Sequence, residues 1–303
     1  MRKVESLIFM VLLLTHLPLM TVNAAHADFS VGPQYGTTHV YVAPGQFDRF
    51  IASFMGTFGG KTSTQGILQV TPTPSLAVSQ LGLTPVGTVS VFGFKTPIPY
   101  PFGLERTGYL VNDFDKAIAA ARASGADVIV GPFSDPLGRD VIIQWPGGVN
   151  MQLYWHNIPP SYAKLKTIPE NRIYISPERA DLFIQAFLRF SKGKIVSDNP
   201  SAPGIEIGQP DKNYRRVRIE SGFGRMVVII TNGHLTWPYG RELTGYEVSN
   251  LKETLEQAVT AGATILVEPF IGEQRLSAMV KFPGGYIAEI HEISSLPAAT
   301  EKP

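Results

Sequence analysis

Residues 101–109 read PFGLERTGY, and residues 238–246 read PYGRELTGY. The same spacing of 137 residues relates WPGG at 145–148 to FPGG at 282–285. Repeated phrases at one constant spacing indicate an internal duplication rather than a local coincidence. The chain is therefore predicted to contain two copies of one domain.

A second match fixes where each copy begins. VYVAP at 40–44 corresponds to IYISP at 173–177, with a spacing of 133 residues, so copy two has four additional residues between these matching blocks. We assign copy one to residues 36–157 and copy two to residues 171–293. The proline-rich stretch 158–170 is predicted to be the linker between them.

The N-terminus has the pattern of an export signal. Arg2 and Lys3 precede an apolar run at 7–22, and AHA at 25–27 is a small-x-small cleavage pattern. We predict that residues 1–27 form a cleaved signal peptide and that the protein is periplasmic or secreted. A retained membrane anchor is the alternative, but the apolar run is short for a span of about 20 residues.

Composition limits the classes of function. The formal net charge is +1, whereas a nucleic-acid-binding surface is typically a strongly basic stripe. No later segment is apolar enough to predict membrane insertion. The chain has no cysteine, which excludes disulfides and a lipid-modified cysteine. The expected partner is a small molecule, and the sequence leaves the oligomeric state open.

Hydrophobic periodicity predicts the same order of elements in both copies. Alternating residues at 38–42 indicate a strand, and an apolar stripe at helical spacing indicates a helix over 48–58, ended by Gly59. The remaining predicted elements of copy one are strands 76–83, 88–94, 107–111, 127–130, 140–144 and 150–155, and a helix over 113–124. In copy two they are helices 179–191 and 251–261, and strands 215–220, 226–231, 278–282 and 286–292.

Several phrases resemble one known superfamily. VNDFD at 111–115, ARASGA at 121–126, and PGG at 146–148 followed by Gln152-Leu153 are similar to the vicinal oxygen chelate superfamily, which includes glyoxalase I, extradiol dioxygenases and bleomycin-resistance proteins. The resemblance covers both copies. It implies an α+β fold with two tandem domains, each built of paired βαβββ modules that form a curved mixed sheet around a ligand or metal.

The resemblance also implies where a metal site would lie. Enzymes of the superfamily hold a divalent metal with histidine and carboxylate, or sometimes amide, ligands on the first and last strands of their modules. In copy one these positions hold His39 and Gln152, with Arg106 at the first strand of the second module. A guanidinium is not a metal ligand and repels a divalent cation.

Copy two departs from the family pattern differently. Arg172 replaces the histidine and Leu243 corresponds to Arg106, whereas Glu289 keeps the carboxylate position. His291 lies two residues further, hence on the same strand face. Glu289 and His291 can be read as a fragment of a metal site. A salt bridge between Arg172 and Glu289 is the simpler interpretation.

Strand alternation assigns a set of side chains to the concave faces. His39 is the best catalytic candidate, as a ligand or general base, and its alternative is a hydrogen-bonded histidine in a pocket without metal. Glu105 and Glu242, which recur in both copies, are expected to fix turns by accepting backbone N–H groups. The predicted ligand-binding residues are His39, Tyr41, Arg106, Gln152, Tyr154, Arg172 and Tyr174, and the metal-site candidates are His39, Gln152, Glu289 and His291.

Three functions follow from these observations. The first is an exported protein of the glyoxalase/bleomycin-resistance type that binds a small organic ligand without a complete metal site or other cofactor; Arg106 is placed to pair with an anionic ligand. The second is a metal-dependent lyase, isomerase or dioxygenase of the same superfamily that uses Zn, Fe, Mn or Ni. The third is a purely structural interaction module, expected if side chains fill both cups.

Overall fold

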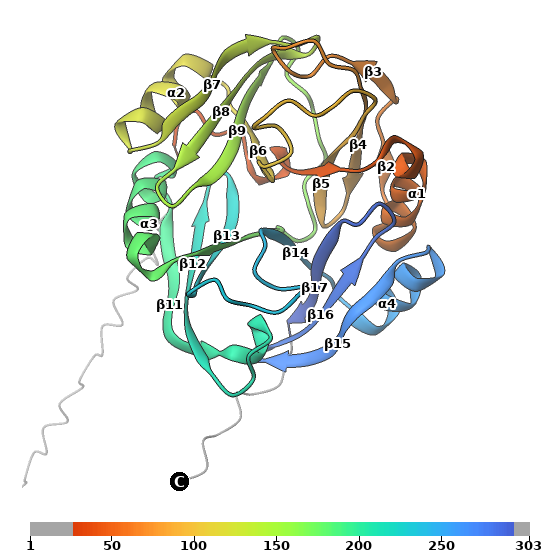
Figure 1. Cartoon of the computed structure of the whole chain (residues 1–303), viewed down its shortest axis with the longest axis vertical. Helices are drawn as coiled ribbons and strands as arrows, with labels where there is room; N and C mark the ends of the chain where they lie inside the picture. Colours follow the sequence, from red (N-terminus) through yellow and green to blue (C-terminus); the bar gives the residue numbers. More distant parts are fainter. Residues whose placement is uncertain (1–26, 294–303) are drawn as a thin grey trace, which may run out of the picture.

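The computed structural model describes residues 27–293, which form two curved mixed sheets, one from each repeat. Figure 1 shows copy one in the upper half and copy two in the lower half of the molecule. Residues 1–26 of the predicted signal peptide lie outside the described residues. The predicted α+β fold with two tandem domains is confirmed.

Copy one contains two βαβββ modules joined side by side. Its sheet has the order β2-β4-β5-β1-β6-β9-β8-β7, with β3 paired to β4. The modules meet where β1 pairs antiparallel with β6, while β1–β5 and β6–β9 are parallel pairs. The elements are β1 (Gly36–Tyr41), α1 (Phe47–Phe58), β2 (Lys61–Thr62), β3 (Gly66–Leu68), β4 (Ala77–Thr84), β5 (Gly87–Phe94), β6 (Thr107–Leu110), α2 (Phe114–Ala123), β7 (Asp127–Ser134), β8 (Gly138–Trp145) and β9 (Val149–His156).

Copy two repeats this arrangement in the order β11-β12-β13-β10-β14-β17-β16-β15. Strand β10 pairs in parallel with β13 and antiparallel with β14, so the same central junction recurs. The elements are β10 (Glu170–Ile175), α3 (Pro177–Ser191), β11 (Lys194–Pro203), β12 (Asn213–Ser221), β13 (Gly224–Ile230), β14 (Leu243–Glu247), α4 (Leu251–Thr260), β15 (Thr264–Gly272), β16 (Arg275–Lys281) and β17 (Ile287–Ile293).

The helices form in the predicted places because local signals define their ends. The Asp113 side chain accepts a hydrogen bond from the Lys116 amide at the start of α2, and Asn250 accepts one from Glu253 at the start of α4. Gly59 ends α1 with a φ of 71°, a conformation that glycine adopts without steric cost. The predicted helix boundaries differ from the observed ones by at most two residues.

The two copies share their hydrophobic cores. One core combines α2 and its strands with α3 and its strands, and includes Trp145 from copy one, Phe187 and Phe223 from copy two, and Phe29 from the segment that precedes copy one. A second core combines α1 with α4 in the same way. Figure 1 shows α2 beside α3 on one side and α1 beside α4 on the other. Each helix pair therefore lies on the outside of the molecule where the two copies meet, and buries one face in a shared core.

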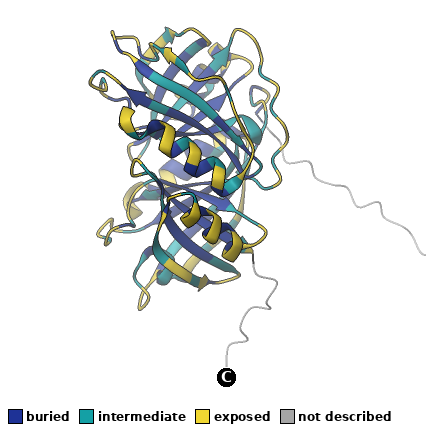
Figure 2. Ribbon diagram, turned by 90° about the vertical axis from the view of Figure 1, so that its right-hand side faces the viewer, coloured by how far each residue is buried: buried dark blue, intermediate teal, exposed yellow. Residues whose placement is uncertain are grey.

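The concave faces of both sheets point away from these shared cores. In Figure 2 the helices have an exposed outer side, whereas the strands beneath them are largely buried. Strand alternation places Met151 and Leu153 of β9 in the core with α2, and the intervening Gln152 and Tyr154 on the concave face. The concave face of each sheet is called cup 1 in copy one and cup 2 in copy two.

The connection between copies carries neither helix nor strand over residues 157–169, and β10 begins at Glu170. At the N-terminus, Ala27 is buried and its N–H donates to the Ser191 carbonyl. The last residue of the predicted signal peptide therefore packs within the folded body. Within residues 27–293, no helix is long and apolar enough to span a bilayer.

Candidate functional site

Cup 1 encloses a cavity of about 390 Å³. Its floor comes from β1, β5 and β9, and its walls come from residues 63–70, the strand β4, and the turn between β7 and β8. Apolar and aromatic side chains alternate with hydroxyl, amide, imidazole and carboxyl groups in the lining. A concave, mostly enclosed site with a few polar groups is the usual form of a small-molecule pocket.

Four of the predicted ligand-binding residues line this cavity. They are His39, Tyr41, Gln152 and Tyr154, from the central strands β1 and β9. The Tyr154 hydroxyl donates to the Tyr35 carbonyl at 2.7 Å, which fixes its ring at the edge of the cup. Strand alternation alone placed these side chains together.

Arg106 is the one predicted ligand-binding residue of copy one that does not line the cavity. It immediately precedes β6, is half-buried, and is not among the residues that line the cavity. Burial raises the pKa of Glu242 and Tyr286 in copy two and of Tyr41 in cup 1, and the charge of Arg106 opposes each of these shifts. The Arg106 carbonyl continues the β1–β6 ladder by accepting a hydrogen bond from the His39 amide. The contact of Arg106 with a ligand therefore stays a prediction that the cavity lining does not support.

His39 occupies the centre of the cup floor. Its side chain is 2% exposed, and its ring meets Phe92 edge-on at 5.6 Å. The imidazole crosses β6 over Gly108, where a Cβ atom would lie only 2.5 Å from Nε2. Glycine at this position therefore makes room for the ring. Within the described chain, Nδ1 of His39 has no hydrogen-bond partner.

Glu105 lies behind His39 and Tyr41. Its carboxylate is fully buried, accepts a hydrogen bond from the Tyr41 hydroxyl, and has Oε1 at 3.6 Å from His39 Nδ1. Burial and the neighbouring carboxylate raise the pKa of Tyr41 well above its usual value, so the phenol keeps its proton. The expectation that Glu105 fixes a turn through backbone N–H groups is wrong; it supports two side chains of the cavity.

Its counterpart Glu242 has a different environment. Burial raises the pKa of Glu242 to about 8, the charge of Arg106 opposes that shift, and the charge of Glu105 reinforces it. Within the described residues, Oε1 of Glu242 has no hydrogen-bond partner. The two glutamates of the repeated phrase therefore have different roles, and neither accepts the backbone hydrogen bonds expected from sequence.

Asp140 of β8 is a further polar group of cup 1. It is 6% exposed, and its Oδ1 accepts a hydrogen bond from Gln152 Nε2 at 2.6 Å. Burial, followed by the charge of Asp135, raises the pKa of Asp140 to about 8, against the lowering effect of the Gln152 hydrogen bond. Asp140 is therefore mostly protonated at neutral pH.

Cup 2 holds a buried ionic cluster instead. Glu289 of β17 lies 3.4 Å from Arg172 Nη1 through Oε1 and 2.8 Å from His291 Nδ1 through Oε2. Glu170 accepts two hydrogen bonds from Arg275, at 2.6 and 2.7 Å. The salt bridge between Arg172 and Glu289 is therefore present, and His291 joins it rather than standing apart from it.

Apolar side chains pack over the rest of the cup 2 surface. Tyr174, which was predicted to bind ligand, packs against a buried cluster from β11–β13 and the segment that follows β11. A second cluster joins Leu243, Met279 and Ile287. Side chains thus occupy the concave face of copy two, as the structural alternative predicts for both cups, whereas cup 1 retains its cavity.

The metal positions implied by the resemblance do not offer a suitable set of donors. In cup 2 the Arg172 guanidinium occupies the first-strand position, and Glu289 already contacts both Arg172 and His291. In cup 1 the Gln152 amide is bonded to Asp140, and the lining holds two imidazoles, those of His39 and His156. Across residues 27–293, no group of three or more His, Cys, Asp or Glu side chains has an arrangement that could hold a metal ion.

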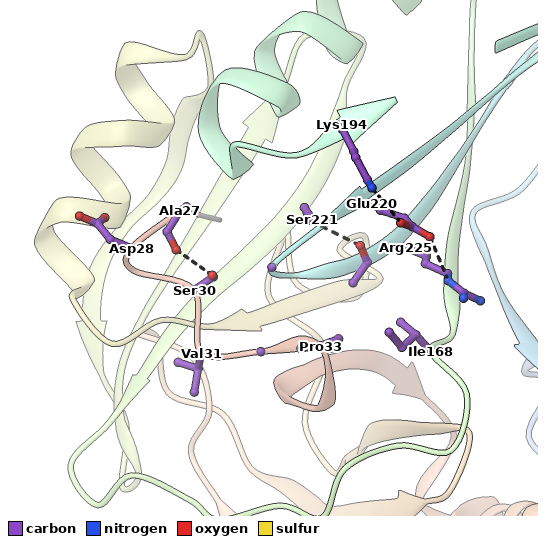
Figure 3. A pocket seen from close by; sticks show the side chains of 13 residues that line it. Ala27, Asp28, Ser30, Val31, Pro33, Ile168, Lys194, Glu220, Ser221 and Arg225 are labelled. Atoms are coloured by element: carbon purple, nitrogen blue, oxygen red, sulfur yellow. Dashed lines mark hydrogen bonds and ion pairs between the residues drawn. The ribbon is translucent and has the colours of Figure 1, made fainter. Parts of the chain in front are cut away.

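A second hollow lies near the start of the described chain. Figure 3 shows it between the N-terminal segment and the β12–β13 hairpin, with a volume of about 500 Å³. Glu220 pairs there with Arg225 at 3.7 Å and with Lys194 at 4.0 Å. These ionic groups pair with one another along adjacent strands on one side of the hollow, and none of the sequence-predicted site residues lines it.

Two residues of cup 1 were missed by sequence reasoning. Asp140 pairs with Tyr154 across β8 and β9, so strand alternation could have assigned it to the same face. Glu105 could have been found from its recurrence, since a glutamate kept in both copies beside the first-strand position is unusual for a turn. Neither signal alone gives the contact with His39.

Comparison with solved structures identifies the fold, whereas the sequence comparisons find no match. No family model matches the sequence, and no curated protein sequence matches it. Solved structures do match: a mutant of 4-hydroxymandelate synthase from Streptomyces coelicolor has a TM-score of 0.57 at 10% identity, over 88% of this chain and 94% of that one.

Two dioxygenase structures are similar at the same level. The 2,3-dioxygenase LapB from Pseudomonas sp. KL28 has a TM-score of 0.51 at 11% identity, over 91% of this chain and 97% of that one. The 2,2',3-trihydroxybiphenyl 1,2-dioxygenase from Sphingomonas wittichii strain RW1 has a TM-score of 0.51 at 12% identity, over 89% and 94%. At such low identity the likeness concerns the fold alone. The chain has the vicinal oxygen chelate fold, in the form of two tandem domains.

Proposed function

We propose that the protein binds a small organic molecule in cup 1 without a bound metal. The observation that carries this proposal is the contrast between the cups. Cup 1 keeps a cavity of about 390 Å³ with a buried, incompletely hydrogen-bonded imidazole on its floor. The same surface of copy two is occupied by ion pairs and apolar side chains. Copy two then serves as a structural partner whose helices complete the shared cores.

The metal-dependent enzyme is the weaker candidate. Its chemistry needs several donors around one ion with a position open to substrate. In cup 1 the carboxyl group beside His39, that of Glu105, accepts a hydrogen bond from the Tyr41 hydroxyl, and the Gln152 amide is engaged by Asp140. We therefore assign His39 to ligand binding, with Glu105 and Tyr41 holding the floor of the cup in place.

The proposal also includes export, because the N-terminal pattern of a signal peptide motivates it. The buried position of Ala27 favours cleavage before this residue rather than after it, since cleavage after it removes the hydrogen bond to Ser191. The expected mature chain then begins at the folded body. Mass spectrometry of the mature N-terminus measures this directly.

A blocked cavity tests the proposed site. Ser79 of β4 lines cup 1 and is half-buried, so Ser79→Trp directs an indole into the cavity without displacing a core side chain. Fragments that bind the chelator-treated wild-type protein in ligand-observed NMR are expected to lose at least tenfold in affinity, because a fragment-sized ligand cannot share the cavity with the indole.

The matched control is Thr73→Trp, which adds the same side chain at an exposed position outside the cavity. It is expected to bind the same fragments as wild type. Equal loss in both variants, or fragments that bind Ser79→Trp unchanged, would place the ligand site elsewhere and refute the proposal.

A further inference from the structure

The acidic side chains that line cup 1 lie on one side of the cavity. Two carboxyl groups, Asp135 and Asp140, lie on the β7–β8 side of the cavity, and none of the described residues that line it is lysine or arginine. The expectation of an anionic ligand depended on Arg106, which lies outside the cavity. An anion in this cup meets carboxyl groups and no fixed positive charge.

Aromatic rings line the other sides of the cavity. Tyr41 stacks on Phe92 with ring centroids 5.3 Å apart, and Tyr154 lies 5.3 Å from His156. Tyr162 also lines the cavity and stacks on Tyr35 with ring centroids 5.1 Å apart. Aromatic faces carry negative electrostatic potential and attract organic cations, most strongly where water is excluded. The carboxyl groups and the aromatic faces therefore both favour a positively charged ligand.

His39 gives the cavity floor a polar group. The side chain lines the cavity at 2% exposure, whereas its Nδ1 faces the buried Glu105 carboxyl group, with Oε1 at 3.6 Å. Glu105 therefore supports the imidazole from behind, and the part of the ring that lines the cavity can contact a ligand.

From this arrangement we infer that cup 1 binds an organic cation: a protonated amine or a quaternary ammonium group joined to an aromatic or apolar body. The cationic group lies toward Asp140 and Asp135, and the apolar body lies against the rings of Tyr41 and Phe92. This inference rests on the proposed function and specifies its ligand class. Recognition then combines charge pairing in a partly dehydrated site with cation–π contact.

Binding of a cation is coupled to loss of the Asp140 proton. Because the pKa of Asp140 is about 8 in the free protein, its carboxyl is mostly neutral at pH 7. A cation beside it stabilises the carboxylate, so the proton leaves to solvent as the ligand enters. Affinity for a permanently charged ligand should therefore rise with pH up to about 8 and level off above it.

Other titratable groups also face this site. Asp135 lies in the adjoining turn, His156 and Tyr154 lie on β9, and His39 lies on β1. Burial lowers the pKa of His156, against the raising effect of Asp135. Protonation of His156 at lower pH adds positive charge and weakens cation binding further. A substitution at Asp140 is therefore needed to separate its contribution from theirs.

Three probes of similar size separate the ligand classes: benzyltrimethylammonium as cation, benzyl alcohol as neutral probe and phenylacetate as anion. Titration calorimetry between pH 6.5 and 9, in buffers of different ionisation enthalpy, measures affinity and proton exchange together. We expect benzyltrimethylammonium to bind about tenfold more tightly than either other probe. We also expect proton release on binding below pH 8.

Two variants locate the effect. Asp140→Asn keeps the side-chain shape and an acceptor for Gln152, and it is expected to abolish both the cation preference and the proton release. Asp135→Asn keeps the acceptor for the Leu137 and Gly138 amides. Because it removes the charge that helps to raise the pKa of Asp140, it should shift the pH dependence to lower pH. If Asp140→Asn folds poorly, Asp135→Asn still tests the pH dependence.

The outcomes distinguish the inference from the proposed function. Benzyl alcohol or phenylacetate that binds as tightly as the cation, with binding lost in Ser79→Trp, overturns the cation class but supports binding in cup 1. A cation preference that persists in Asp140→Asn, or proton uptake in place of release, also overturns the inference. Absence of binding by all three probes contradicts it as well, and the fragment comparison with Ser79→Trp then decides the proposed function separately.

Discussion

Replacing Glu289 with alanine is expected to lower the free energy of unfolding by about 3–5 kcal/mol, as is typical when one partner of a buried ion pair is removed. Glu289 is buried and contacts both Arg172 and His291. The variant leaves the Arg172 guanidinium buried without this carboxylate. Chemical denaturation monitored by circular dichroism measures the change.

A double substitution provides the control for this prediction. Arg172→Met together with Glu289→Ala removes both charges, so the double variant should be more stable than Glu289→Ala alone. A loss below about 1 kcal/mol in the single variant, the range of an exposed ion pair, would contradict the proposed structural role of cup 2.

The pH dependence of the same variant has a definite sign. Burial alone raises the pKa of Glu289, but the neighbouring His291 and Arg172 outweigh it and lower the pKa to about 2. A carboxyl with a lowered folded-state pKa stabilises the protein above its unfolded value, near 4.5, and this contribution disappears as the pH falls toward 2. Wild type should therefore lose more stability than Glu289→Ala between pH 5 and pH 3.

The second large effect is expected at Phe54, in the core shared by α1 and α4. Phe54→Ala should cost about 3–5 kcal/mol, the usual range for truncating a buried phenylalanine. The ring is 1% exposed and lies 5.6 Å from Tyr246 and 5.3 Å from Phe282, both in copy two. Because the Phe54 ring packs in a core that both copies share, the variant should unfold at a lower denaturant concentration than wild type. Unfolding should remain a single transition that includes both copies.

Phe58→Ala on the same helix is the matched comparison. Phe58 is only half-buried at the margin of this core, so its truncation should cost less than that of Phe54. Trp145 packs in the core shared by the copies, whereas Trp155 lies in copy one and Trp237 in copy two, so fluorescence of variants that retain only Trp155 or only Trp237 reports on each copy. Two separate transitions in Phe54→Ala, with copy two unaffected, would show that the copies have independent cores.

The fold could be predicted because the sequence repeats. The phrases at 101–109 and 238–246 fix the alignment of the copies, and alternation within β9 correctly divides Gln152 and Tyr154 from Met151 and Leu153. The sequence did not reveal that the copies share cores, because helix stripes show which side is buried and not which helix covers it. Strand β11 was not predicted, since its prolines are unfavourable in strand interiors.

The candidate site was less predictable for a physical reason. Alternation gives the face of a sheet on which a side chain lies but not how far it reaches, so it did not show that Arg106 is outside the set of residues that line the cavity. The Tyr41–Glu105 hydrogen bond and the raised pKa of Asp140 depend on burial by segments distant in sequence. The pairing of Arg172 with Glu289 was foreseen because both lie within regular strands at matched positions of copy two.

The central claim is that cup 1 is a ligand site without a bound metal. Elemental analysis of protein purified without chelator, from medium supplied with Zn, Fe, Mn and Ni, tests it most directly. Because the donors around His39 and Glu289 are engaged with other side chains, we expect each metal to remain well below one equivalent per chain. One equivalent of any of these metals, lost together with binding in His39→Ala or Glu289→Ala, would contradict the account.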